Sequence, residues 1–314
     1  MKTQENTPMR DAFFNRLFEL AKEDRNIIVI AADMGAPAMD QFRTDLAGQY
    51  IDAGIAEQSA ILTAAGLAHS GKKPYVYAIA PFVSTRIHEF IKIEAGLMKL
   101  PIKLLGVGAG YGYNDSGPTH HNVEDISIIT PIPNVEVYNP SDSFMTAHFA
   151  EITAKSNKPA YIRLDRKNQR GKYANTKVTD FSEGYTHMGE TQQNGLCIIA
   201  TGNTVDIALD AKEHLLNKTG QKADVIDFYR LKPITDKLKN TIKKYDAIIT
   251  IEEHMLRGGM GSIISEIITD NNIPTKLKRI GLTNYTYEYG TREDLQAKMG
   301  ITKEAIINSI ESLL

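Results

Sequence analysis

Short runs of β-branched residues alternate with helix-length segments over most of this sequence, and this alternation limits the possible folds more than any other feature. Strand-like runs occur at residues 26–31, 50–53, 74–79, 102–107, 135–138 and 160–164. Between them, residues 56–69 and 82–100 are rich in Ala, Leu and Ile and contain no proline, which is typical of packed helices. Such alternation predicts crossover units on a mostly parallel sheet.

A polar segment interrupts the pattern, which then resumes. Residues 171–194 lack a sustained apolar period, so we expect them to be a linker. Further strand-like runs follow at residues 196–201, 223–228, 247–252 and 276–280. A chain of 314 residues is long enough for about two domains of roughly 150 residues. We therefore predict an α/β fold with two doubly wound sheet domains, residues 1–170 and a smaller one at residues 195–314.

Composition excludes several classes of protein. Lys and Arg number 36 against 38 Asp and Glu, so the chain lacks the basic excess that nucleic-acid binding requires. No apolar stretch approaches the roughly 18 residues of a membrane span, and the N-terminus has no apolar signal segment. Cys197 is the only cysteine, which excludes an internal disulfide or a thiolate metal cluster. We expect a soluble, cytoplasmic protein.

Two glycine-rich segments are possible phosphate or nucleotide sites. Residues 108–112 read Gly-Ala-Gly-Tyr-Gly, but this spacing and the lack of a following helix do not indicate a dinucleotide fingerprint. Residues 258–261, Gly-Gly-Met-Gly, open a helix, where they either hold an anion with free amides or form a tight turn packed against a strand. The sequence contains no P-loop motif.

Polar residues are concentrated between residues 114 and 125. If a helix begins near His121, then His121, Glu124 and Asp125 share one face and form a possible divalent-metal triad. Alternatively, the acidic residues interact only with the helix dipole and the histidine is solvated. A metal-dependent hydrolase that uses these side chains with His120 is therefore one competing function.

Glu57 is an ionisable residue in apolar surroundings, with Ile55 and Ala56 before it and Ile61 and Leu62 after it. A carboxyl group there loses part of its hydration, which raises its pKa and favours the protonated form. The alternative is an ordinary first-turn glutamate that interacts with the helix dipole. Local sequence leaves both interpretations open.

Five motifs, taken in order, resemble transketolase and deoxyxylulose phosphate synthase. They are Ile-Asp-Ala-Gly-Ile-Ala-Glu-Gln at 51–58, Ala-Ala-Gly-Leu-Ala at 64–68, Gly-Pro-Thr-His-His at 117–121, Ile-Pro-Asn-Val at 132–135 and Asn-Pro-Ser-Asp at 139–142. The resemblance spans nearly the whole chain. It implies a pyrimidine-binding domain at residues 1–170, followed by a transketolase C-terminal-like domain at residues 195–314.

The sequence departs from full-length members of this family in one respect. It contains no Gly-Asp-Gly motif, with which the family holds the diphosphate of thiamine diphosphate and its Mg²⁺. The resemblance therefore implies one half of a split transketolase and no metal ligands on this chain. The partner is then an N-terminal subunit that carries the diphosphate-binding domain, in an α₂β₂ assembly.

The resemblance also assigns residues to the cofactor. Glu57 matches the catalytic glutamate that donates a hydrogen bond to the aminopyrimidine ring, a role that requires the protonated carboxyl group. Phe82 matches the aromatic residue that stacks on the pyrimidine, unless it is plain helix core. Tyr77 is expected to replace pocket tyrosines that relatives carry elsewhere. Asp33 follows the first strand, where α/β sites gather.

Substrate-binding residues follow from the same comparison. His120 matches a catalytic histidine that contacts the donor, with His121 beside it, and Asp115 matches the acid that selects a substrate hydroxyl. Arg163 matches the arginine that binds the substrate phosphate, and Arg166 is the neighbouring alternative.

These roles imply transfer of a two-carbon ketol unit from a ketose phosphate to an aldose. A deoxyxylulose phosphate synthase-like enzyme and a 2-oxoacid dehydrogenase β-subunit are the alternatives within the same cofactor class.

Overall fold

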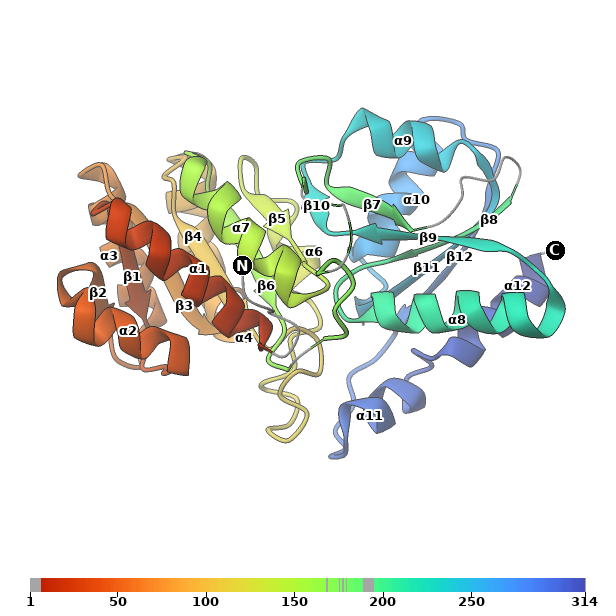
Figure 1. The fold of residues 1–314 in the computed structure, drawn as a ribbon, viewed down its shortest axis with the longest axis horizontal. Coiled ribbons are helices and arrows are strands. Elements are labelled where there is room, and N and C mark those ends of the chain that lie inside the picture. Colours follow the sequence, from red (N-terminus) through yellow and green to blue (C-terminus); the bar gives the residue numbers. More distant parts are fainter. Residues whose placement is uncertain are drawn as a thin grey trace.

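The computed structural model describes residues 7–167, 169–174, 176, 178, 180–188 and 195–313. It contains two α/β domains that lie side by side (Figure 1). Each is built on a parallel sheet with one antiparallel edge strand. This confirms the predicted fold class. No helix in the described ranges is long and apolar enough to cross a bilayer.

The N-terminal domain holds a seven-stranded sheet with the order β10-β5-β6-β4-β3-β1-β2. Its elements are α1 (Met9–Glu23), β1 (Ile27–Ala31), α2 (Pro37–Asp45), η1 (Ala47–Gln49), β2 (Tyr50–Asp52), α3 (Glu57–His69), β3 (Lys73–Ile79), α4 (Ala80–Val83), α5 (His88–Phe90), η2 (Ile91–Leu97), β4 (Lys103–Val107), α6 (Asp125–Ile129), β5 (Glu136–Tyr138), α7 (Ser143–Lys155) and β6 (Ala160–Leu164).

The C-terminal domain holds a five-stranded sheet with the order β12-β11-β8-β9-β7. Its elements are β7 (Tyr185–Met188), β8 (Gly195–Ala200), α8 (Thr204–Thr219), β9 (Ala223–Phe228), α9 (Asp236–Ile242), β11 (Tyr245–Met255), α10 (Met260–Asp270), β12 (Lys276–Leu282), α11 (Arg292–Lys298) and α12 (Lys303–Leu313).

Helices cover both faces of the first sheet. On one face, α1 and α7 pack over Tyr75 and Tyr77 of β3, and on the other, α3 packs over Val76 and Ala78. Successive strand residues point to opposite faces, so each side of β3 needs an apolar neighbour. The central strands are therefore buried along their whole length, which explains their continuous apolar runs.

Two elements cross the expected domain boundary. β10 (Arg230–Lys232) follows β9 of the C-terminal domain but pairs antiparallel with β5 at the edge of the N-terminal sheet. β7 lies within the expected linker and pairs with β9. Residues 189–194 of that linker lie outside the described residues.

The segment expected to be one helix at residues 82–100 is broken. α4 ends at Val83, a turn covers residues 84–87, and η2 is a π-helix. The Ser84 hydroxyl donates to the Ala80 carbonyl at 2.6 Å, and a Cβ on Gly96 would lie 2.5 Å from the Ile132 side chain. Both contacts stabilise the irregular backbone of this segment. π-Helical turns are frequent at functional sites.

Buried charges join the two domains. The Arg292 guanidinium donates to Asp165 at 2.6 Å, to Glu253 at 2.9 Å and to the Ala109 carbonyl at 3.0 Å. Burial lowers the pKa of Arg292, but the two carboxylates raise it more, so the guanidinium stays charged. A Cβ on Gly110 would lie 2.1 Å from the Glu253 carboxylate. Gly110 therefore permits close packing against Glu253.

The second glycine-rich segment caps α10 internally. The amides of Met260 and Gly261 donate to the buried Glu252 carboxyl group at 2.6 and 2.8 Å. Burial raises the pKa of Glu252 to about 8. The acceptor at this helix N-terminus is thus a side chain of the chain itself, in keeping with the tight-turn interpretation.

Candidate active site

The predicted site residues follow strands that end at one edge of the N-terminal sheet. Strands β2, β1, β3, β4 and β6 run parallel, so their carboxyl ends lie together. The segments that leave these ends carry Glu57, Phe82, His120 and Arg166. This edge is where ligands bind in open α/β sheets.

Glu57 is the first residue of α3 and is only 3% exposed. The predicted burial of this side chain is confirmed. Its Oε2 atom accepts a hydrogen bond from Arg86 Nη1 at 2.9 Å. Arg86 is not among the residues that the motifs predict, although it follows Phe82 by four residues, a spacing that brings side chains together on a helix.

Phe82 lies in α4, directly after β3, and is half-buried. The Arg86 guanidinium carbon is 4.0 Å from the centre of the Phe82 ring. The Phe82 ring also packs edge-on against His120, with 5.3 Å between ring centres. Phe82 therefore connects the Glu57 end of the site to the histidine.

The contacts continue from His120 to charged residues at the surface. The ring centres of Tyr113 and His120 are 6.2 Å apart, and the Arg166 guanidinium lies 4.5 Å from the Tyr113 ring centre. Arg166 pairs with Asp115 at 3.3 Å. A hydrogen bond from Ser116 and the charge of Arg166 lower the pKa of Asp115, so it is a carboxylate at neutral pH.

These contacts define a continuous line of side chains, which we call the site array. Its members are Glu57, Arg86, Phe82, His120, Tyr113, Arg166 and Asp115. One end is a buried carboxyl group that Arg86 connects to an aromatic ring, and the other is an exposed pair of opposite charges. Such an array can hold a planar heterocycle at one end and a polar, anionic substrate at the other.

The C-terminal domain supports the loop that carries His120. The Asn114 amide donates to the Gly290 carbonyl at 2.6 Å. Gly117 has a φ of +77°, and a Cβ there would lie 3.3 Å from the Tyr289 hydroxyl. The segment before α11 thus lies against the loop.

Two predicted residues lie away from the site array. The Tyr77 ring is fully buried on the face of β3 that α1 and α7 cover, edge-on to Phe14 of α1 at 5.0 Å, so it belongs to the core. The Arg163 side chain is 1% exposed, and its Nε donates to Asp125 at 2.9 Å. Its Nη2 donates to the carbonyls of Asn122 and Glu253. The structure therefore contradicts the expected roles of Tyr77 and Arg163, because neither side chain is accessible to a ligand.

His121 and Asp33 also stand apart from the array. His121 is buried and packs edge-on against Tyr111, with 5.0 Å between ring centres, and burial lowers its pKa. Asp33 is exposed at the carboxyl end of β1 with a φ of +49°. The contacts that link the array include neither residue.

The possible metal triad does not assemble. Asp125 is held by Arg163, and Glu124 accepts a hydrogen bond from the Tyr285 hydroxyl at 3.1 Å. Within the part of the chain that the structure describes, no three His, Cys, Asp or Glu side chains are grouped to hold a metal ion. The geometry gives the metal-dependent hydrolase no support.

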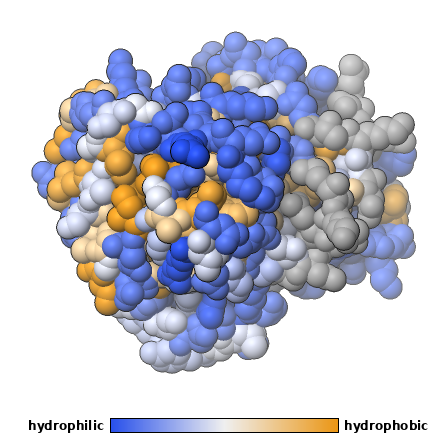
Figure 2. Space-filling model, turned by 60° about the vertical axis from the view of Figure 1, so that its left-hand side comes forward, coloured by the Kyte–Doolittle hydropathy of each residue, from blue (hydrophilic) through white to orange (hydrophobic). Residues whose placement is uncertain are grey.

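Exposed hydrophobic side chains occur shortly before Glu57 in the sequence, on α3, and on and just after the neighbouring η2. The most exposed is Ile55, at 78%. The others in this region are Leu62 on α3, Ile93 and Leu97 on η2, and Met98. Figure 2 shows hydrophobic patches on the forward face of the N-terminal domain. A monomer rarely exposes such groups together without a partner.

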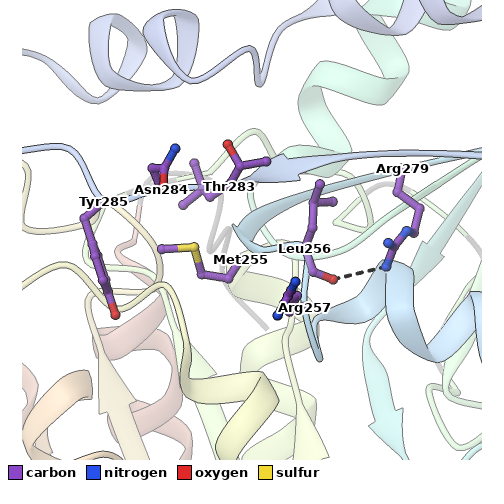
Figure 3. A pocket seen from close by; sticks show the side chains of 8 residues that line it. Met255, Leu256, Arg257, Arg279, Thr283, Asn284 and Tyr285 are labelled. Carbon is purple, nitrogen blue, oxygen red and sulfur yellow. Dashed lines mark hydrogen bonds between the residues drawn. The ribbon is translucent and has the colours of Figure 1, made fainter.

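A separate cavity of about 580 Å³ lies in the C-terminal domain, where β11 and β12 end (Figure 3). Its lining includes Arg257, Arg279 and Tyr285, and Arg279 donates to the Leu256 carbonyl at 3.2 Å. None of the residues predicted for the site lines this cavity.

Comparison with known proteins agrees with this architecture. The family profile "Transketolase, pyrimidine binding domain" matches residues 5–172, and "Transketolase, C-terminal domain" matches residues 186–306. The chain is 32% identical to a subunit of apulose-4-phosphate transketolase from Phocaeicola vulgatus over 95% of this chain and 94% of that protein. It is 31% identical to 1-deoxy-D-xylulose-5-phosphate synthase of Halothermothrix orenii, of which it spans 49%.

A solved structure described as "Split gene transketolase, inactive beta4 tetramer" superposes with a TM-score of 0.86. The two sequences are 27% identical, and the match covers 98% of each chain. The chain therefore belongs to the transketolase family and is a subunit of a transketolase-type enzyme.

Proposed function

We propose that this chain is the pyrimidine-binding subunit of a split transketolase that transfers a two-carbon ketol unit from a ketose phosphate to an aldose. Family membership implies dependence on thiamine diphosphate. The observation that carries the proposal is the buried Glu57 carboxyl group, which Arg86 connects to Phe82 and so to His120 and Arg166.

The Glu57 end of the array fits the ring half of the cofactor. A planar aminopyrimidine needs a hydrogen-bonding carboxyl group at its edge and an aromatic ring on its face, and Glu57 and Phe82 provide these. When bound, thiamine diphosphate supplies the carbon nucleophile for ketol transfer. Glu57 then donates a proton in a hydrogen bond to the ring nitrogen, which activates the cofactor, and Phe82 orients the ring.

We assign the diphosphate and Mg²⁺ to a partner subunit. No metal-holding group of side chains occurs among the described residues, and the sequence has no Gly-Asp-Gly motif. The exposed hydrophobic residues on α3 and the neighbouring η2 suit an interface next to the helix that carries Glu57. The relative from Phocaeicola vulgatus is named as one subunit of its transketolase, and the β4 assembly of the similar structure is described as inactive. These names support an N-terminal partner and an α₂β₂ complex.

The exposed end of the array suits the substrate. Because Arg163 is inaccessible, we assign the substrate phosphate to Arg166, whose planar guanidinium matches phosphate oxygens. His120 contacts the donor between Phe82 and Tyr113, and the Asp115 carboxylate accepts a hydrogen bond from a sugar hydroxyl. The array then orders cofactor, donor carbonyl and donor phosphate from the interior outwards.

A reconstitution assay tests the proposal. The purified chain is assayed alone and with its N-terminal partner, thiamine diphosphate and Mg²⁺, against a panel of ketose phosphates that includes apulose 4-phosphate. We expect ketol transfer only in the complex. Robust turnover by the chain alone would refute the split-subunit assignment. Pyruvate decarboxylation without ketol transfer would instead favour the deoxyxylulose phosphate synthase-like alternative.

A further inference from the structure

Arg86 lies between the two residues that we assign to the cofactor ring. Its Nη1 atom is 2.9 Å from Glu57 Oε2, and its guanidinium carbon is 4.0 Å from the centre of the Phe82 ring. One side chain thus contacts both the carboxylate and the aromatic face. Figure 1 places the supporting helices α3 and α4 in the N-terminal domain.

The guanidinium group resembles an aminopyrimidine in the features that these two partners recognise. It is planar and delocalised, stacks on aromatic faces, and forms a hydrogen bond with the Glu57 carboxyl group from its edge, although as donor where the ring nitrogen is an acceptor. A pyrimidine ring that accepts a hydrogen bond from Glu57 and stacks on Phe82 needs the same carboxyl group, now protonated, and the same ring face. The two groups therefore compete for one position.

We propose that Arg86 is an internal placeholder, which occupies the pyrimidine position in the empty subunit and has to swing out when the cofactor binds. This inference rests on the proposed function. The surroundings permit the movement, because Arg86 lies in the turn of residues 84–87 and its side chain is 38% exposed. Its rotation into solvent disrupts no helix or strand.

The placeholder has a physical purpose. The Glu57 side chain is 4% exposed, and a buried carboxylate without a partner is strongly unfavourable. Arg86 pairs with the Glu57 carboxylate until the cofactor binds, so the cofactor-free site remains folded. The affinity for the cofactor is reduced by the free energy needed to displace Arg86. The partner's hold on the diphosphate then provides the remaining binding energy.

Substitution of Arg86 by Met tests the idea in the complex with the N-terminal subunit. Calorimetric titration with thiamine diphosphate and Mg²⁺ is expected to show binding about tenfold tighter than in the wild type. The melting temperature of the cofactor-free complex should fall, because Glu57 loses its partner. Opposite changes in affinity and stability distinguish a placeholder from a residue that only supports the fold.

Arg43 offers a matched control. It also lies over an aromatic ring, 5.2 Å from the centre of Tyr50, and pairs with Asp40 at 3.3 Å. Its side chain is 39% exposed, close to the value for Arg86. Arg43→Met should leave the affinity for thiamine diphosphate unchanged.

The possible outcomes separate the two proposals. Unchanged or weaker binding by Arg86→Met overturns the placeholder while the proposed function stands. If the wild-type complex binds no thiamine diphosphate, the proposed function itself fails. If Arg86→Met does not fold, Arg86→Lys keeps the charge but loses the planar fork, and should bind more tightly than the wild type by a smaller factor. Equal binding by Arg86→Lys then counts against the inference.

Discussion

Replacement of Arg292 by Met should severely destabilise the interface between the two domains. The Arg292 side chain is 5% exposed, and its partners Asp165 and Glu253 are 3% and 0% exposed. Removal of the guanidinium leaves both carboxylates buried without their cation and leaves the Ala109 carbonyl without this donor. The resulting cost is electrostatic and is not relieved by water.

The structure sets the size of the effect. Loss of one partner from a buried ion pair costs about 3–5 kcal/mol, a large part of a total stability of roughly 5–15 kcal/mol. We expect the melting temperature to fall by on the order of 10 °C. The control is Arg170→Met, which removes an exposed pair with Asp210 at 2.9 Å and should cost about 0–1 kcal/mol.

Scanning calorimetry and urea unfolding at pH 7 measure both variants. Because Arg292 joins elements of both domains, its loss should also separate the unfolding of the two domains into distinct transitions. A loss of stability no larger than that of Arg170→Met would refute the reasoning, since burial would then make no difference to the value of the ion pair.

Three further predictions concern protonation and the site array. Burial raises the pKa of Glu252 to about 8 from 4.5, so the contribution of Glu252 to stability is complete below pH 4.5 and is lost as the pH rises through 8. Glu252→Gln should flatten this decline in the free energy of unfolding, measured with urea between pH 5 and 8. An unchanged slope contradicts this prediction. Glu57→Gln should lower turnover by about 100-fold without loss of fold, measured in the reconstituted complex with circular dichroism as the folding check. Arg166→Met should raise KM for phosphorylated donors by about 10- to 100-fold, whereas an equal effect on unphosphorylated donors would reassign Arg166. His120→Ala should raise KM for both kinds of donor, and unchanged kinetic constants would reassign His120.

Strands were more predictable than the connections around the site. Residues 160–164 and 223–228 were expected as strands and match β6 and β9, because fully buried parallel strands form continuous apolar runs. The break within residues 82–100 was not predictable. The π-helical part of this segment brings Gly96 close to Ile132, and local composition does not reveal which residue faces that glycine.

The same distinction applies to the site. Short motifs predicted Glu57 and Phe82 as site residues, and their neighbours in sequence place both at the carboxyl edge of the N-terminal sheet. Arg163 matched a motif equally well, but its role is set by Asp125, 38 residues earlier in the chain. For Tyr77, alternation along the strand shows that neighbours face opposite ways, but not which face carries the ligand.

The strand β10 connects the two domains, because it follows β9 of the C-terminal sheet in the chain and pairs with β5 of the N-terminal sheet. A gene break within residues 171–194 would separate the helices of the two domains. It would also remove β10 from the N-terminal sheet, so β5 would become an unpaired edge strand. Recombination that exchanges the C-terminal domain of one relative for another therefore has to bring a β10 that fits the recipient's β5. The segment that has to be exchanged as one unit with the N-terminal domain therefore extends to β10, beyond the polar segment at residues 171–194.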